Sequence, residues 1–134
     1  MDGPLVTALR RLGFAWVFDT AFSADLTIME EATEIISRVT KGENLPVLTS
    51  CCPGWVNFVE RRYPSLIPHL SSCKSPQMMM AATIKNHFAK QNNLSRDEIF
   101  VVSIVPCIAK KWERSVAEVN DAGYGSDVDL VLTT

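Results

Sequence analysis

The distribution of apolar and polar positions predicts amphipathic helices that alternate with short strands. The helices are expected over Pro4–Leu12, Ser23–Arg38, Pro53–Tyr63, Pro76–Gln91 and Lys110–Val119. The strands are expected over Phe14–Phe18, Leu45–Leu48, Ile99–Val105 and Val128–Leu132. The Ile99–Val105 segment is β-branched and almost wholly apolar, as is typical of a strand covered on both faces. This alternation predicts an α/β layered domain with a mostly parallel sheet flanked by helices.

The long helix predicted over Ser23–Arg38 carries one apolar stripe, which we expect to face the core. Its members are Ile28, Met29, Ala32, Ile35, Ile36 and Val39. Glu31 lies at the edge of this stripe, and Glu34 and Arg38 lie just beyond it. From helix geometry alone, Glu34 and Arg38 form a solvated i,i+4 ion pair worth roughly a few tenths of a kcal/mol.

Composition excludes several classes of partner. The 134 residues are 47% hydrophobic, which is enough for one buried core, and 13 basic against 15 acidic side chains give a net charge of −2. No basic surface for nucleic acid is indicated, and no apolar run is long enough to cross a bilayer. We expect no nucleic-acid partner and no membrane insertion. Without a visible targeting segment we expect a cytoplasmic location, which a preceding segment could change.

The four cysteines are the first candidates for chemistry: Cys51, Cys52, Cys73 and Cys107. Disulfides are not expected, because a chain of this size can fold without covalent cross-links. The cysteine spacing also lacks the C-x2-C pairs that are typical of zinc sites. Cys52 and Cys107 each follow a predicted strand and precede a helix, where ligands bind in open α/β sheets. Thiols near helix N-termini suit metal binding or proton transfer. The alternative is that they are ordinary buried residues.

Adjacent cysteines add a geometric constraint. Successive side chains of an extended backbone point in opposite directions, so we do not expect Cys51 and Cys52 to bind the same metal atom. One thiol could be a ligand while its neighbour faces different chemistry.

The segments around these cysteines resemble the iron-only ([FeFe]) hydrogenases. Thr49–Trp55, with the sequence TSCCPGW, is similar to the first signature of that family, T-S-C-C-P-x-W. Val105–Glu113, with the sequence VPCIAKKWE, is similar to the second, M-P-C-x-x-K-x-x-E. Further likeness lies in Phe18–Thr20, Ala24–Glu31 and Lys74–Gln77, so the resemblance covers essentially the whole chain.

The resemblance implies a catalytic H-cluster, a [4Fe-4S] cubane joined to a two-iron subsite with CO, CN and azadithiolate. By resemblance, Cys52 and Cys107 are two of the four cubane ligands, an ordinary use of cysteine thiolates. Cys51 matches the free thiol that passes protons to the azadithiolate amine. Lys110 matches the lysine that donates to an iron-bound cyanide, and Gln77 is expected to line the two-iron pocket.

The resemblance also implies a catalytic role for the long helix. Glu34, Ser71 and Glu31 match a route that carries protons from the surface to Cys51, with Arg38 at its entrance. A carboxylate in a medium of low dielectric constant has a raised pKa, which we expect to let these glutamates change protonation state near neutrality.

Two departures from the family pattern affect the expected domain. Val105 replaces the methionine that opens the second signature, and the third signature, which carries the other two cubane ligands, is absent. Residues 1–134 are therefore expected to be a partial H-cluster domain that lacks its downstream part and is inactive alone. Cys73 matches no ligand and is expected to be a small buried residue.

The resemblance implies a piece of an [FeFe]-hydrogenase that catalyses 2H⁺ + 2e⁻ ⇌ H₂. Its partners would be ferredoxin or a similar electron carrier and the maturation proteins that insert the H-cluster. One alternative is a hydrogenase-like iron–sulfur assembly protein without H₂ activity, although such a scaffold needs no proton route. A sensory hydrogenase is a second alternative.

Overall fold

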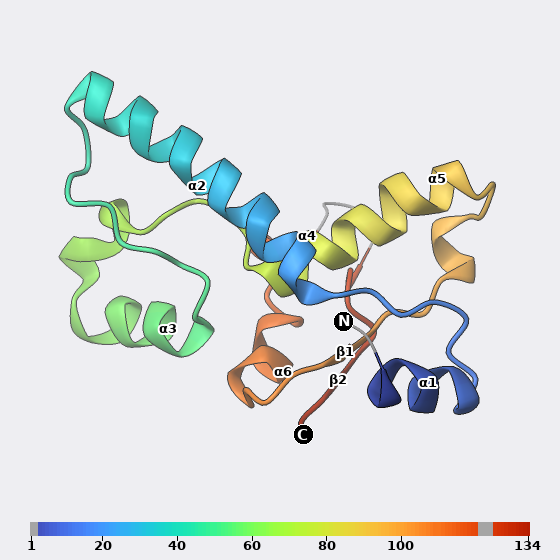
Figure 1. The fold of residues 1–134 in the computed structure, drawn as a ribbon. Coiled ribbons are helices and arrows are strands. Elements are labelled where there is room, and N and C mark those ends of the chain that lie inside the picture. The colour runs from blue at the N-terminus through green and yellow to red at the C-terminus, as the bar shows by residue number, and fades with distance from the viewer. Residues whose placement is uncertain (1–2, 121–124) are drawn as a thin grey trace.

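The computed structural model describes residues 3–120 and 125–134. The helices are α1 Pro4–Arg11, α2 Thr20–Lys41, α3 Pro53–Arg62, α4 Pro76–Thr83, α5 Ala89–Gln91 and α6 Ala109–Glu113 (Figure 1). The strands are β1 Val102–Ile104 and β2 Leu130–Leu132. A π-helical turn, Ile84–Phe88, joins α4 to α5, and 3₁₀ turns lie at Pro64–His69, Arg96–Glu98 and Ala117–Val119.

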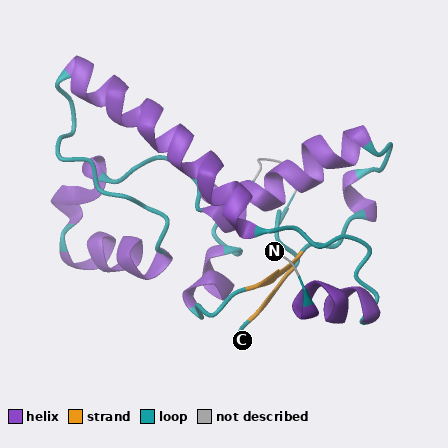
Figure 2. Cartoon of the chain, in the orientation of Figure 1, coloured by secondary structure: helices purple, strands orange, loops and turns teal. Residues whose placement is uncertain are grey.

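The sheet is small, parallel and covered by helices, which confirms the predicted α/β class. Val102 lies opposite Leu130 and Ile104 opposite Leu132, and the connection between the two strands contains α6. Figure 2 shows the two strands beneath the helices as the sole sheet of the described residues.

Two of the four predicted strands are absent from this sheet. The Phe14–Phe18 segment is a loop that belongs to no ladder. Its rings pack instead, because Trp16 and Phe18 meet Phe88 edge-on at centroid distances of 5.3 and 5.2 Å. The Leu45–Leu48 prediction shrinks to one parallel bridge between Leu48 and Leu70. Aromatic packing and a single bridge thus take the place of strand pairing.

The core lies between α4 and the sheet. Met78 and Ala81 of α4 pack with Val128 and Val131, all almost completely buried. Burying a side chain of the size of valine or methionine contributes about 1.5–3 kcal/mol. This cluster therefore fixes α4, whose first turn carries Gln77, against the sheet.

Helix α2 has a capping residue at each end. The Asp19 side chain accepts a 2.9 Å hydrogen bond from the Ala21 amide, and Gly42, with φ of 70°, adopts the left-handed conformation that ends the helix. The helix is three residues longer at each end than predicted. It has 22 residues, yet no helix in the described ranges is long and apolar enough to cross a membrane.

The predicted burial of the α2 stripe is wrong for this structure. The side of α2 that packs against α4 buries Ser23 and Thr27 instead, and the Thr27 hydroxyl lies 3.2 Å from the Met79 sulfur. No element in the described part of the chain covers the apolar stripe. All its members are exposed: Ile28, Met29, Ala32, Ile35, Ile36 and Val39.

Three other helices begin where predicted, at Pro4, Pro53 and Pro76; the first two end one residue early, and the third is divided by the π-helical turn. The last helix differs most. Helix α6 ends at Glu113 instead of continuing to residue 119. The Asn120 amide donates to the carbonyls of Arg114 (2.9 Å) and Val116 (2.7 Å), which stabilises a turn here. Side-chain competition for backbone groups explains the early stop.

Candidate functional site

Three cysteines lie at the starts of two helices that contact each other. Cys51 and Cys52 precede α3, and Cys107 precedes α6, which packs against α3. All three are free thiols; Cys52 and Cys107 are exposed, whereas Cys51 is half-buried. Cys52 has extended backbone angles, as the opposed-direction argument for the cysteine pair requires.

This donor set fits part of an iron–sulfur site. Two exposed, uncrosslinked thiols at helix starts are available to bind iron as thiolates. Within residues 3–120 and 125–134, no three side chains of the types His, Cys, Asp or Glu form a metal-binding group. The described residues therefore supply two ligands at most, and Cys52 and Cys107 remain a prediction for that role.

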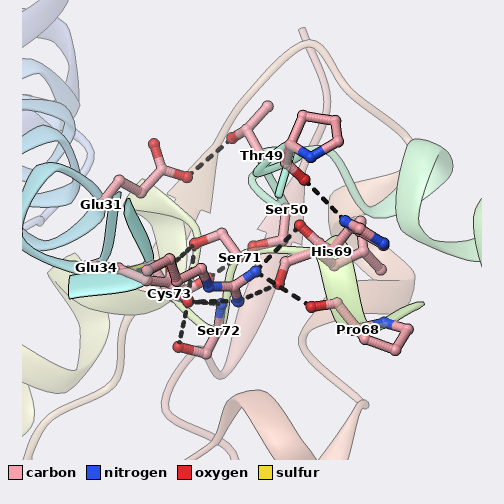
Figure 3. Close-up of polar contacts among 12 residues, drawn as sticks. Glu31, Glu34, Thr49, Ser50, Pro68, His69, Ser71, Ser72 and Cys73 are labelled. Carbon is pink, nitrogen blue, oxygen red and sulfur yellow. Dashed lines mark hydrogen bonds and ion pairs between the residues drawn. The ribbon is translucent and has the colours of Figure 1, made fainter. Parts of the chain in front are cut away.

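A hydrogen-bonded cluster surrounds the carboxylate of Glu34 (Figure 3). The Ser71 hydroxyl donates to Glu34 Oε2 at 2.5 Å, while the amide and hydroxyl of Ser72 both donate to Oε1 at 3.0 Å. Arg38 Nη2 donates to the same Oε1 at 2.7 Å. The predicted neighbours Glu34 and Ser71 are thus in direct contact.

The predicted rise in pKa is wrong for Glu34. Burial alone would raise the pKa, but hydrogen bonds from Ser71, Ser72 and Arg38 outweigh it and lower the pKa to about 2, against an ordinary value of 4.5. Donors aimed at a carboxylate favour its charged form. Glu34 is therefore almost wholly ionised at neutral pH.

Arg38 is more than a solvated partner of Glu34. Both side chains are only 14% exposed, and the guanidinium also donates to three consecutive carbonyls, those of Pro68 (3.1 Å), His69 (3.3 Å) and Leu70 (2.7 Å). These bonds attach the turn that leads to Ser71 onto α2. The predicted i,i+4 ion pair forms, but its description as solvated is wrong, and a place for Arg38 at the entrance of a proton route stays a prediction.

A second polar chain links Glu31 to Cys51. Thr49 Oγ1 donates to Glu31 Oε1 at 2.9 Å and lies 3.6 Å from Cys51 Sγ (the Glu31–Thr49 bond is drawn in Figure 3). Among the described hydrogen bonds, none joins Ser71 directly to Glu31. The four predicted proton-route residues therefore form two pairs, and Thr49 connects the second pair.

Lys110 reaches from α6 to the cysteine turn. Its ammonium donates to the backbone carbonyl of Cys51 at 2.8 Å and to Glu113 Oε2 at 2.9 Å. A cation is thus held directly beside the thiol-bearing turn, where an anionic ligand could meet it.

Gln77 lies in the interior, and its amide is engaged by protein groups. Its nitrogen contacts the Lys110 carbonyl and Glu113 Oε2, both at 3.3 Å, and its oxygen accepts from the Ser103 hydroxyl at 2.8 Å. Gln77 thus contacts the helix that carries Lys110, and its place in a two-iron pocket stays a prediction.

Cys73 is half-buried beside the Glu34 cluster. Its amide donates to Ser71 Oγ at 3.2 Å, and its carbonyl accepts from Ser50 Oγ at 3.0 Å. Partial burial raises the pKa of this thiol. Its backbone therefore joins the Ser71 segment to the cysteine turn.

Sequence reasoning missed Thr49 and Glu113. Both residues stand inside the two quoted signatures, so their positions were visible, but no spacing rule connects Thr49 to α2 or Glu113 to α4. Their contacts span 18 and 38 positions and depend on tertiary structure.

Comparisons with known proteins point to one family. The family model for the iron-only hydrogenase large subunit, C-terminal domain, matches residues 1–134. The chain is 47% identical to the NADP-reducing hydrogenase subunit HndD of Solidesulfovibrio fructosivorans, over 100% of this chain and 24% of that protein. It is 39% identical to the cytosolic Fe-S cluster assembly factor narfl of Xenopus tropicalis, over 97% and 29%.

A solved structure of the same family is also similar to this chain. The apo [FeFe]-hydrogenase of Chlamydomonas reinhardtii superimposes with a TM-score of 0.90 and 46% identity, over 96% of this chain and 33% of that one. The chain thus spans about a quarter to a third of the proteins it matches.

Proposed function

The chain belongs to the iron-only hydrogenase large-subunit family, and from this premise we propose that it takes part in the reaction 2H⁺ + 2e⁻ ⇌ H₂ at an H-cluster. In this proposal it supplies two cubane ligands, a cyanide-directed cation and the last part of a proton route. Electrons would come from ferredoxin or a similar carrier.

The chain of hydrogen bonds Glu31–Thr49–Cys51 carries this proposal. A carboxylate, a hydroxyl and a thiol follow one another at 2.9 and 3.6 Å, which is the arrangement that proton transfer along a relay needs. The thiol at its end stands next to Cys52, one of the two proposed cubane ligands. An iron–sulfur protein without H₂ chemistry has no use for such a relay.

The H-cluster, when bound, would supply the redox and H–H bond chemistry. Cys52 and Cys107 would hold its cubane, and Lys110 would stabilise an anionic ligand beside the Cys51 turn. Cys51, as the thiol at the end of the relay, would hold and release the transferred proton.

The low pKa of Glu34 limits how this residue takes part. At pH 7 a carboxyl with a pKa of about 2 is protonated in about one molecule in 10⁵, a cost of about 7 kcal/mol. That cost is a lower limit to the barrier for transfer through Glu34, and it lies below the barrier of about 13–17 kcal/mol that corresponds to a usual kcat of about 1–10³ per second. We therefore propose that Glu34 passes protons through Ser71 without storing them.

The similarity to cytosolic Fe-S cluster assembly factors favours a second candidate, an iron–sulfur assembly role without H₂ activity. Such a protein would bind clusters through the same cysteines. H₂ production therefore separates the two candidates, whereas iron content does not.

The test uses the full-length gene product that carries these residues, loaded with the H-cluster. With a reduced viologen as electron donor, the wild type should evolve H₂, and Cys51→Ser should lose about 10²–10⁴-fold in kcat with its iron content unchanged. Glu30→Gln is the control, since it changes an exposed side chain of α2 outside the relay. No H₂ from the loaded wild type favours the assembly role, and near wild-type rates in Cys51→Ser refute the proton relay.

A further inference from the structure

Glu113 is a buried carboxylate at the junction of three segments. It lies in the last turn of α6, and its side chain is only 5% exposed. Its four hydrogen bonds come from three donors, Lys110 of α6 and Ser75 and Gln77 at the start of α4. The role of this residue is not explained by the proton relay, which it does not touch.

Glu113 accepts hydrogen bonds at both carboxylate oxygens, three at Oε2 and one at Oε1. Lys110 Nζ lies 2.9 Å from Oε2 and 3.2 Å from Oε1. Ser75 Oγ and Gln77 Nε2 donate to Oε2 at 2.9 and 3.3 Å. A buried carboxylate with a full set of donors has a defined orientation, and so do the groups that donate to it.

The ammonium of Lys110 has three N–H groups, and two of them have partners. One donates to the Cys51 carbonyl at 2.8 Å, and one is shared between the oxygens of Glu113. Because the nitrogen is tetrahedral, fixing two N–H directions also fixes the third. The third N–H is left for a ligand beside the cysteine turn.

We propose that Glu113 is a positioning residue that holds the Lys110 ammonium against the Cys51 turn and so directs its remaining N–H to an anionic, cyanide-type ligand. The identity of the ligand depends on the function proposed above. The contact from Glu113 through Lys110 to the Cys51 carbonyl, called the tether below, does not depend on it. Without the carboxylate, three donors lose a common acceptor: Lys110, Ser75 and Gln77. The Lys110 ammonium then no longer has a fixed position, and its hold on the Cys51 turn weakens.

An ordinary i,i+3 surface pair would not have this effect. Exposed pairs change little when they are broken, because water replaces the partner. Here the Lys110 and Glu113 side chains are only 14% and 5% exposed, and two further buried donors depend on the same carboxylate. Breaking such a pair leaves charges and donors without a partner.

The first measurement needs no cofactor. In the full-length gene product, hydrogen–deuterium exchange is followed over peptides that contain residues 50–56, for the wild type and for Glu113→Gln, Glu113→Asp and Glu118→Gln. Glu118 is the matched control, an exposed glutamate just beyond α6. We expect exchange at least 10-fold faster in Glu113→Gln, partial rescue in Glu113→Asp and wild-type exchange in Glu118→Gln.

The second measurement uses the loaded protein. Glu113→Gln should shift or broaden the infrared cyanide bands and lower kcat with little change in KM for the electron donor, whereas Glu118→Gln should change neither. If Glu113→Gln does not fold, Lys110→Met removes the same tether from the other side and should give the same faster exchange.

The outcomes separate the two proposals. Wild-type exchange in Glu113→Gln or in Lys110→Met overturns the tether, whether or not the protein makes H₂. Faster exchange with unaltered cyanide bands overturns the ligand-directing part. Faster exchange together with a wild type that binds no H-cluster keeps the tether and refutes the proposed function.

Discussion

Replacing Glu34 by glutamine should remove a pH-dependent part of the free energy of unfolding. The folded pKa of Glu34 is about 2, against an ordinary value of 4.5. Because the folded pKa is the lower one, ionised Glu34 stabilises the folded state fully above pH 4.5. This contribution is lost as the pH falls through 4.5 towards 2.

The size of this effect follows from the shift. A difference of 2.5 pKa units at about 1.4 kcal/mol per unit gives about 3 kcal/mol near neutral pH. The side chain is only 14% exposed, so solvent screening reduces this value little. At pH 3 only about 1 kcal/mol should remain, so the wild type should lose about 2 kcal/mol more than Glu34→Gln between pH 6 and pH 3.

The assay is urea denaturation of the full-length gene product without cofactor, followed by tryptophan fluorescence at pH 6 and pH 3. Glu30→Gln, on the exposed side of the same helix, is the matched control and should retain the wild-type pH dependence. The same loss of stability in the wild type and Glu34→Gln would refute the assignment of a depressed pKa to this carboxyl.

Two further variants test the framework that holds the site. Met78→Ala empties the centre of the buried cluster between α4 and the sheet and should lower the free energy of unfolding by about 2–5 kcal/mol, measured by urea denaturation, whereas the exposed Met29→Ala should change it little. Asp19→Ala removes the N-cap of α2 and should cost about 1 kcal/mol in the same measurement, with Asp19→Asn retaining most of the stability; an unchanged midpoint in Asp19→Ala would contradict the capping role.

The helices were predictable because their signals are local. Prolines at Pro4, Pro53 and Pro76 begin helices, and the three positions are correct to the residue. Local signals gave wrong predictions where long-range contacts determine the conformation. The Phe14–Phe18 run has the composition of a strand, yet its rings pack on Phe88.

The burial of the α2 stripe failed for a related reason. Periodicity shows that one side of a helix is apolar, but it does not show what covers that side. In the described residues α4 packs on the side that carries Ser23 and Thr27. A helix can thus be predicted correctly while its packing surface is not.

The candidate site was predictable in its residues but not in its connections. Motif similarity singled out Glu34 and Ser71, and they meet at 2.5 Å. The pKa of Glu34 was predicted in the wrong direction, since nothing in the sequence indicated the two donors from Ser72, which join those of Ser71 and Arg38 at the carboxylate. Electrostatics depends on such tertiary contacts more than on residue type.

The geometry of the cysteine turn depends on side chains more than on the sheet. Within the described residues the backbones of the segments around Thr49 and Ser71 pair at one β-bridge, between Leu48 and Leu70, and the Ser50 hydroxyl adds a hydrogen bond to the Cys73 carbonyl. Their position is fixed instead by Arg38 and Glu34 from α2 on one side and by Lys110 from α6 on the other.

Side chains that form such a framework serve structure and chemistry at once. A residue that holds a loop through its charge also sets the electric field on the groups in that loop. Substitutions at Glu34 or Lys110 should therefore change stability and reactivity together. Activity alone then cannot assign a role to either residue, and a measurement on the protein without cofactor is needed to separate the two contributions.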